Sequence, residues 1–133
     1  MVVPVISLWN PWAIWVGLGW KKIETRTHER FKGLVGKQIG IHSALKWDDT
    51  ALELAGEYLS EDQRIQTRGF LRVGGAICWT AYVTAHRELD PLDSKAALID
   101  CEHVTRYGLF LSDVTMIEVI PCKGKQGIWY HEL

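Results

Sequence analysis

The sequence predicts an α+β fold: a small β-barrel of about six short strands, with two or three helices around it. Short β-rich segments separated by turn residues recur along the chain, and two other segments carry apolar residues at helical spacing. The longest strand candidate, residues 74–85, is semi-apolar on both faces, which suits a closed or covered sheet. With 133 residues and 47% hydrophobic content, we expect a single domain, 1–133, that buries a sizeable core.

The N-terminal residues predict a strand followed by a short helix. The segment Val2–Leu8 is β-rich and forms the first predicted strand. Asn10 is a good N-cap and Pro11 suits the first helical position, so a helix should run to about Leu18. Gly19 is the expected residue just beyond its end, because glycine tolerates the left-handed conformation there. The predicted core face of this helix consists of Pro11, Ile14, Trp15 and Leu18.

The middle of the chain predicts two strands and two helices. A strand at Lys22–Arg26 would place Lys22, Glu24 and Arg26 on one face, and a strand at 36–42 would place Ile39 and Ile41 on one face. A helix capped by Asp48 or Asp49 should run to about Leu59, with Ala51, Leu54, Ala55 and Tyr58 facing the core. Ser60 and Gln63 have the spacing of a capping box, which predicts a short further helix.

The C-terminal half is predicted to be mostly strand. After the strand at 74–85, residues 86–106 are irregular apart from a short helix at 94–99. Strands are expected at 107–111, 115–120 and 128–132, with a glycine-flanked basic loop before the last of them.

Charge and cysteine content exclude several classes of protein. A net charge of −1 argues against a protein that coats nucleic acid nonspecifically, although residues 1–47 are basic and residues 48–62 are acidic. Three widely spaced cysteines without metal-ligand spacing predict reduced thiols, with no disulfide framework, no metal and no cofactor. The chain shows neither a signal peptide nor an apolar run long enough for a membrane span, so a cytoplasmic protein without membrane contact is expected.

Three pieces of the sequence resemble one family. Gly19-x-Lys21-x-x-Glu24-x-Arg26 looks like the Gly-x-Lys-x-x-Glu-x-Arg signature of the ASCH domain, a branch of the PUA-like superfamily. The lead-in from Ser7 to Ala13 is similar to that family's, with Asn10 where glutamine is common, and the tail 121–129 resembles its closing strand. The resemblance spans essentially the whole chain. It is close to the domain found in transcription coactivators of the activating-signal-cointegrator type and in small stand-alone bacterial and phage proteins. It implies a PUA-like β-barrel with a cleft beside the first helix, and RNA or nucleotide recognition.

The candidate site combines the charged signature with nearby tryptophans. Strand parity favours Lys22 beside Glu24 and Arg26, whereas the signature selects Lys21, and we follow the signature. An arginine binds phosphate or a base edge bidentately, a glutamate accepts hydrogen bonds from an exocyclic amine, and a lysine supplies positive charge. Tryptophan rings offer stacking surfaces, and a basic glycine-rich loop can contact phosphate. The predicted ligand-binding residues are Trp9, Pro11, Trp12, Lys21, Glu24, Arg26, His42, Lys123 and Gln126.

Two other functions stay open. The first is a metal-independent hydrolase, either a ribonuclease or an amidohydrolase acting on acetylated cytidine, with Lys21 and Glu24 as catalytic residues. Such amidohydrolases are understood to use a threonine three residues after the lysine; here that position holds Glu24, and Thr25 is displaced by one. The second is an adaptor in transcription or translation control, which would contact a protein partner through the acidic helix at 48–59.

Overall fold

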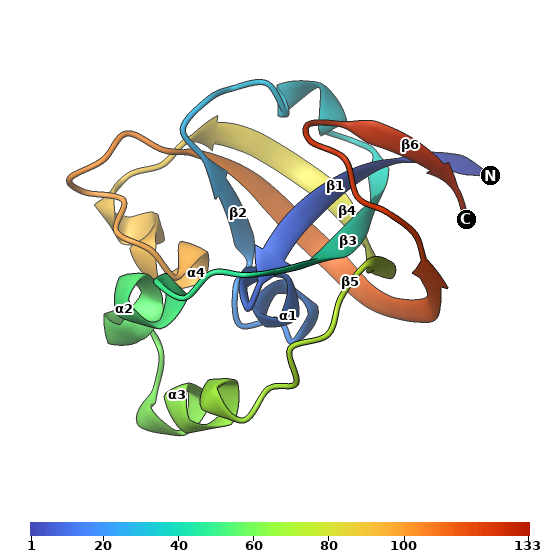
Figure 1. Ribbon diagram of the computed structural model, residues 1–133. Coiled ribbons are helices and arrows are strands. Elements are labelled where there is room, and N and C mark those ends of the chain that lie inside the picture. Colours follow the sequence, from blue (N-terminus) through green and yellow to red (C-terminus); the bar gives the residue numbers. More distant parts are fainter.

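A computed structural model describes residues 1–133 (Figure 1). The strands are β1 (Val2–Asn10), β2 (Ile23–Arg26), β3 (Gln38–Trp47), β4 (Ala76–Glu88), β5 (Tyr107–Pro121) and β6 (Trp129–Glu132). The helices are α1 (Trp12–Gly17), α2 (Ala51–Ala55), α3 (Glu61–Arg68) and α4 (Ser94–Ala97), with single 3₁₀ turns at Lys32–Leu34, Gly56–Tyr58 and Pro91–Asp93. The α+β class and the six strands agree with the sequence prediction.

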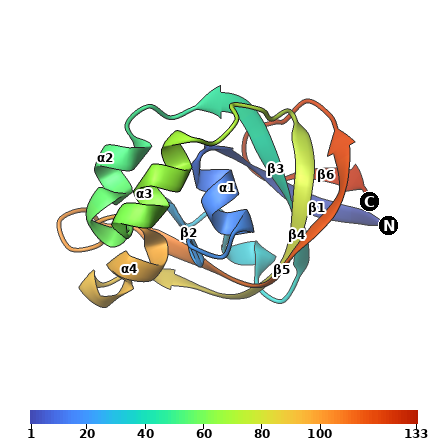
Figure 2. The ribbon, with the colours of Figure 1, turned by 90° about the horizontal axis from the view of Figure 1, so that it is seen from below.

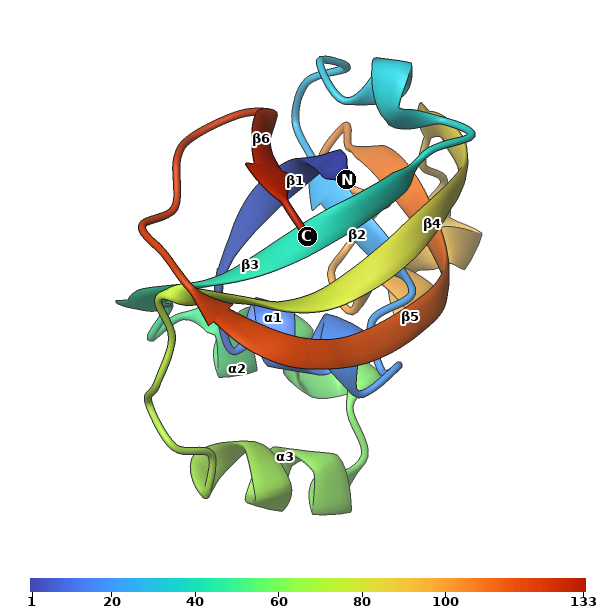
Figure 3. The same cartoon turned by 90° about the vertical axis from the view of Figure 1, so that its right-hand side faces the viewer.

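The six strands form one mixed sheet that curls into a barrel-like shape without closing (Figure 3). The strand order is β2-β5-β4-β3-β1-β6, so β2 and β6 are the two edges. β1 and β3 run parallel, with Ile6 opposite Ile41, and every other pair is antiparallel. The parallel pairing brings the C-terminal ends of β1 and β3 together, which places Asn10 opposite Trp47 beside the start of α1.

The main core lies inside the curled sheet. Ile39 and Ile41 are both fully buried, as the period-two pattern predicted. They pack in one cluster with Ile6 and Leu8 from β1, and with residues of β4 and β5. Each fully buried aliphatic side chain of this kind contributes on the order of 1.5–3 kcal/mol of transfer free energy.

Helix α1 lies between the curled sheet and the outer helices α2 and α3 (Figure 2). Ala13 and Val16 join the barrel core, whereas Trp15 packs outward with residues of α2. The predicted single core face of α1 is therefore wrong except at Pro11 and Trp15, and Leu18 is 51% exposed. This six-residue helix packs against the barrel core on one side and against α2 on the other, so it has no single apolar stripe.

Several predicted boundaries shift. Asn10 does not cap α1; its amide donates instead to Ser43 Oγ at 2.7 Å and to two backbone carbonyls, while Pro11 occupies the N-cap position. The predicted strands at 107–111 and 115–120 form one strand, β5, which continues through Asp113 at a φ of 52°. The strand predicted to end at His42 continues to Trp47.

Two local predictions are confirmed. Gly19 has a φ of 78° just beyond α1, the left-handed conformation expected there. Ser60 and Gln63 form the reciprocal capping box at the start of α3. All three cysteines are free. No helix in the structure combines the length and the apolar character needed to cross a membrane.

Candidate functional site

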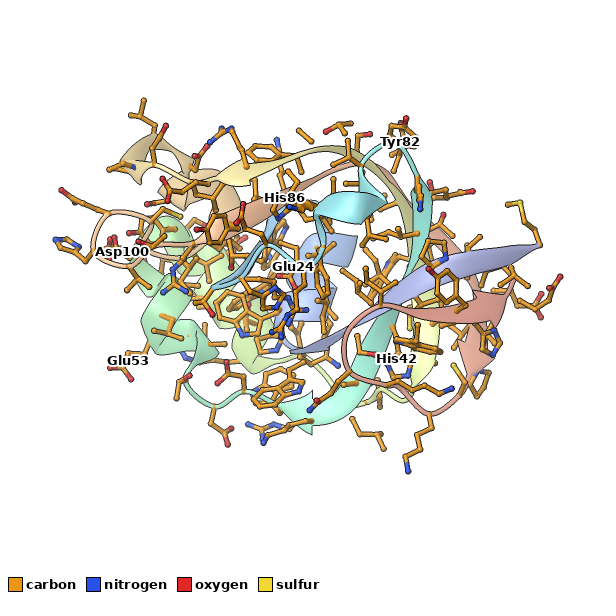
Figure 4. The ribbon with its side chains drawn as sticks, turned by 90° about the horizontal axis from the view of Figure 1, so that it is seen from above. Glu24, His42, Glu53, Tyr82, His86 and Asp100 are labelled. Atoms are coloured by element: carbon orange, nitrogen blue, oxygen red, sulfur yellow. The ribbon has the colours of Figure 1, made fainter.

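A cleft of about 340 Å³ opens where the end of β1, the start of α1 and the edge strand β2 meet. We call it the Glu24 cleft, and its volume is within the range of small-molecule sites. In Figure 4, Glu24 lies on one side of the β1 ribbon and His42 on the other. The residues lining the cleft are Ser7, Leu8, Trp9, Trp12, Glu24, Thr25, Arg26, Asp48, Leu54, Ile99 and Arg106.

Glu24 and Arg26 form an ion pair in this cleft. Arg26 Nη2 lies 3.1 Å from Glu24 Oε2, with side-chain exposures of 32% and 7%. The guanidinium also stacks 5.0 Å from the ring centre of Phe31, which fixes its plane. Glu24 Oε1 accepts a hydrogen bond from the backbone amide of Thr25 at 3.0 Å. Both charged groups are thus held in place at the cleft wall, with the arginine the more accessible of the two.

Lys21 lies beneath the cleft rather than on its wall. Its side chain is completely buried, its ammonium donates to the carbonyl of Ala97, and its Nζ lies 5.1 Å from the ring centre of Trp12. Burial lowers the pKa of Lys21 to about 8, and the nearby Glu24 carboxylate opposes part of that effect. β2 begins only at Ile23, so strand parity does not apply to Lys21, while Lys22 is exposed. The signature therefore selected the lysine that lies close to Glu24.

Asp48 also lines the cleft, although the sequence analysis assigned it only to helix capping. Its Oδ2 accepts a hydrogen bond from Trp12 Nε1 at 2.8 Å, which fixes the indole ring. Partial burial alone would raise the pKa of Asp48, but hydrogen bonds from Thr50 and Trp12 outweigh it and hold the pKa below its ordinary value. Asp48 is therefore a carboxylate at neutral pH, and Trp12 keeps its orientation.

Sequence reasoning also missed Arg106 and Ile99 at this cleft. Both come from the segment 86–106, which has no regular pattern, and Arg106 is positioned by donating from Nε to the carbonyl of Asp100 at 2.7 Å. No local signal marks either residue as part of a site, because only the packing of that segment against β2 brings it there.

A second depression, which we call the His42 pocket, lies beside the first and measures about 560 Å³. His42 is 2% exposed; its Nε2 lies 2.9 Å from the carbonyl of Cys122, and its Nδ1 is buried without a partner. A carbonyl only accepts, so Nε2 carries the proton. The same pocket is lined by Lys123, Lys125 and Gln126 of the loop before β6.

The predicted ligand-binding residues therefore fall into separate groups. Trp12, Glu24 and Arg26 line the Glu24 cleft, whereas His42, Lys123 and Gln126 line the His42 pocket. Trp9 borders both and is 48% exposed. Lys21 and Pro11 line neither; Pro11 is buried and lines a smaller depression that also includes Asp48.

One group of side chains has the composition of a metal site. Ligand atoms of Asp100, Glu102 and His103 lie within 4.8 Å of one another. Asp100 already accepts hydrogen bonds from the backbone of the two others, and His103 Nδ1 lies 3.0 Å from Asp100 Oδ2. These contacts account for the cluster as an exposed turn, and it is separate from both depressions.

Comparison with known proteins identifies the fold. No family model matches the chain, and no curated protein matches it. The solved structure of ASCH from Zymomonas mobilis is similar to the chain, with a TM-score of 0.58 and 14% identity over 97% of this chain and 87% of that one. Two single-substitution mutants of the same protein match with TM-scores of 0.58 and 0.54, at 16% and 17% identity. The mutant with the TM-score of 0.58 covers 97% of this chain and 87% of its own chain, and the other covers 89% and 74%. The chain has the ASCH fold.

Proposed function

We propose that this ASCH-fold chain binds RNA or a nucleotide, with a base held in the Glu24 cleft. The observation that supports this function most strongly is the fixed Glu24–Arg26 ion pair in a cleft bordered by two tryptophans. Base recognition needs polar groups at set positions together with flat apolar surfaces, and this cleft offers both.

Different side chains contact different parts of the ligand. Each Glu24 oxygen accepts one hydrogen bond within the protein, which leaves lone pairs for an amine of a base. Trp12, fixed by Asp48, and the more exposed Trp9 present ring faces or edges for stacking. Arg26 is anchored by Phe31 on one side, and its exposed part is available to a phosphate.

Substitution of the ion pair should abolish most binding. We expect Glu24→Gln and Arg26→Met each to weaken the affinity for single-stranded RNA or nucleoside monophosphates by roughly tenfold or more, because each removes a charge-assisted hydrogen bond. Fluorescence anisotropy and isothermal titration calorimetry measure this. Lys22→Met is the matched control, because Lys22 is an exposed cation of the same segment that does not line the cleft. Wild-type affinity in both cleft variants would refute the assignment of the site.

Hydrolysis is the second candidate function, and one observation favours it. A lysine with a pKa near 8 can act as a general base at neutral to mildly alkaline pH, and Glu24 lies nearby. Thr25 also lines the cleft, although it is displaced by one position from the place expected of a hydrolytic threonine. Against this, the Lys21 ammonium already donates to Ala97 and lies beneath the cleft, beside the ring of Trp12. Binding is therefore the better-supported function.

Direct assays separate the two candidates. We expect no turnover of N4-acetylcytidine or of single-stranded RNA over hours at pH 7 to 9, measured by chromatography of the products. Turnover that disappears in Lys21→Met and persists in Lys22→Met would instead establish a hydrolase, with Lys21 as its base.

A further inference from the structure

Trp9 stands at the junction of three depressions. The Glu24 cleft and the His42 pocket both include Ser7 and Trp9 in their linings, and so does a third depression of about 620 Å³. We call the third one the Arg30 trough. It shares Arg26 with the Glu24 cleft, and Lys125 with the His42 pocket. The three depressions thus adjoin one another around a half-exposed indole, and we call them together the groove.

The net charge changes along this groove from balanced to positive. The Glu24 cleft contains two carboxylates, Glu24 and Asp48, beside its arginines. The Arg30 trough and the His42 pocket contain no acidic residue and several basic ones. In the trough, burial and the neighbouring arginines lower the pKa of His28, so the positive charge there comes from Arg26, Arg30 and Lys125. Acceptors for a base lie at one end, and cations for phosphates occupy the rest.

At the far end of the groove, close packing fixes the loop that carries Lys123 and Lys125. A Cβ at Gly124 would lie 2.7 Å from His42 Nδ1 and 2.8 Å from Ser7 Oγ, so only glycine lets the loop pack this closely. Ser7 Oγ also accepts a hydrogen bond from Trp129 Nε1 at 3.1 Å, and the Cys122 carbonyl is bonded to His42. These contacts hold the backbone between two exposed lysines, Lys123 and Lys125, against the groove. The buried Nδ1 of His42 has no partner at this point.

We infer that the ligand is a single-stranded RNA segment of two or more nucleotides, which runs from the Glu24 cleft past Trp9 to the Lys123–Lys125 loop. The inference rests on the proposed function and makes the ligand more specific: a mononucleotide would occupy only the first part of the groove. One base enters the Glu24 cleft, and the following phosphate lies against Arg26 and Arg30, whereas Lys123 and Lys125 contact the phosphate of the next nucleotide. The next nucleotide reaches the His42 pocket, and Trp9 provides a stacking surface between the two.

The bound strand should neutralise positive charge on both sides of Trp9. Lys46 Nζ already lies 4.1 Å from the ring centre of Trp9, on an indole that remains half exposed, so this ring is flanked by a cation before any ligand binds. Phosphate contacts by Lys123 and Lys125 would add to the salt dependence of binding, whereas hydrogen bonds and stacking to a base in the Glu24 cleft would not. The two parts of the groove are therefore separable by experiment.

The test compares the nucleoside 5′-monophosphates with RNA homotetramers of A, C and U. We expect the preferred tetramer to bind roughly tenfold or more tightly than the preferred monophosphate, since additional phosphate and stacking contacts form. The double variant Lys123→Ala/Lys125→Ala should remove most of that gain and reduce the salt slope of tetramer binding by about 1.4, at about 0.7 for each lost phosphate contact. It should leave monophosphate affinity unchanged.

The control is Lys32→Ala/Lys37→Ala, which removes the same charge from two exposed lysines that line none of the three depressions. Equal affinity for tetramer and monophosphate would overturn the inference and leave the proposed function standing. An equal loss of tetramer binding in the two double variants would also overturn it. If the wild-type protein binds neither probe, the proposed function fails together with the inference.

Discussion

Trp15→Ala should lower the free energy of unfolding by about 3–5 kcal/mol, the largest loss we expect from a single substitution in this chain. Trp15 is fully buried where α1 meets the outer helices, and it packs with Ala51, Ala55 and Leu98. Its ring meets Trp12 edge to face at 5.0 Å. The truncation removes this contact area, leaves a cavity, and deprives Thr67 Oγ1 of a donor that now lies at 3.0 Å.

Urea denaturation at pH 7 followed by far-UV circular dichroism measures this loss. Trp9→Ala is the matched control: it changes the same residue type at the other side of the strand–helix junction, where the ring is half exposed. We expect this control to lower stability by about 1 kcal/mol or less while weakening RNA binding. Similar stability losses in the two variants would show that α1 is not anchored through Trp15.

The buried Lys21 should make stability depend on pH in the alkaline range. Its pKa is lowered from 10.5 to about 8 by burial, so between these values the unfolded state binds more protons than the folded state. The free energy of unfolding therefore rises with pH through this window. The lysine imposes its full penalty below about pH 8 and none above about pH 10.5, a change of roughly 3 kcal/mol.

Lys21→Met isolates this effect, because the cysteines and tyrosines that also titrate in this range are common to both proteins. We expect the wild-type protein to gain roughly 3 kcal/mol relative to Lys21→Met as the pH rises from 7.5 to 10.5, in urea denaturation at fixed ionic strength. The neighbouring Lys22→Met should show no such trend, since Lys22 is exposed. Parallel pH profiles for wild type and Lys21→Met would mean that Lys21 is solvated.

The predicted elements were most accurate where local chemistry decides the structure. The capping box at Ser60, the left-handed Gly19 and the alternation at Ile39 and Ile41 each depend on residues close together in the sequence. Helix α1 was the main error, because its burial depends on two layers that lie far away in the sequence. Asn10 is similar: its side chain bonds to β3 and to the carbonyl of Val73, which compete successfully with helix capping.

The site could be predicted only in part for the same reason. The spacing of Glu24 and Arg26 on a strand is enough to place both charges on one face, and they do form an ion pair. The burial of Lys21 depends on α4, whose Ala97 carbonyl accepts a hydrogen bond from the ammonium, and Arg106 reaches the cleft only through the packing of an irregular segment. A contact between residues 76 positions apart, such as Lys21 and Ala97, leaves no local pattern in the sequence.

By itself, the sequence determined the α+β class, the approximate positions of most strands, and the residue types of the candidate site, because these follow from local periodicity and turn chemistry. Only the tertiary structure decided that this site is divided. The parallel pairing of β1 with β3 and the return of the chain in β6 place the Lys123–Lys125 loop against His42, on the other side of Trp9 from Glu24. The relative positions of these residues are set by how the sheet curls, which depends on packing contacts between residues that are remote in the sequence.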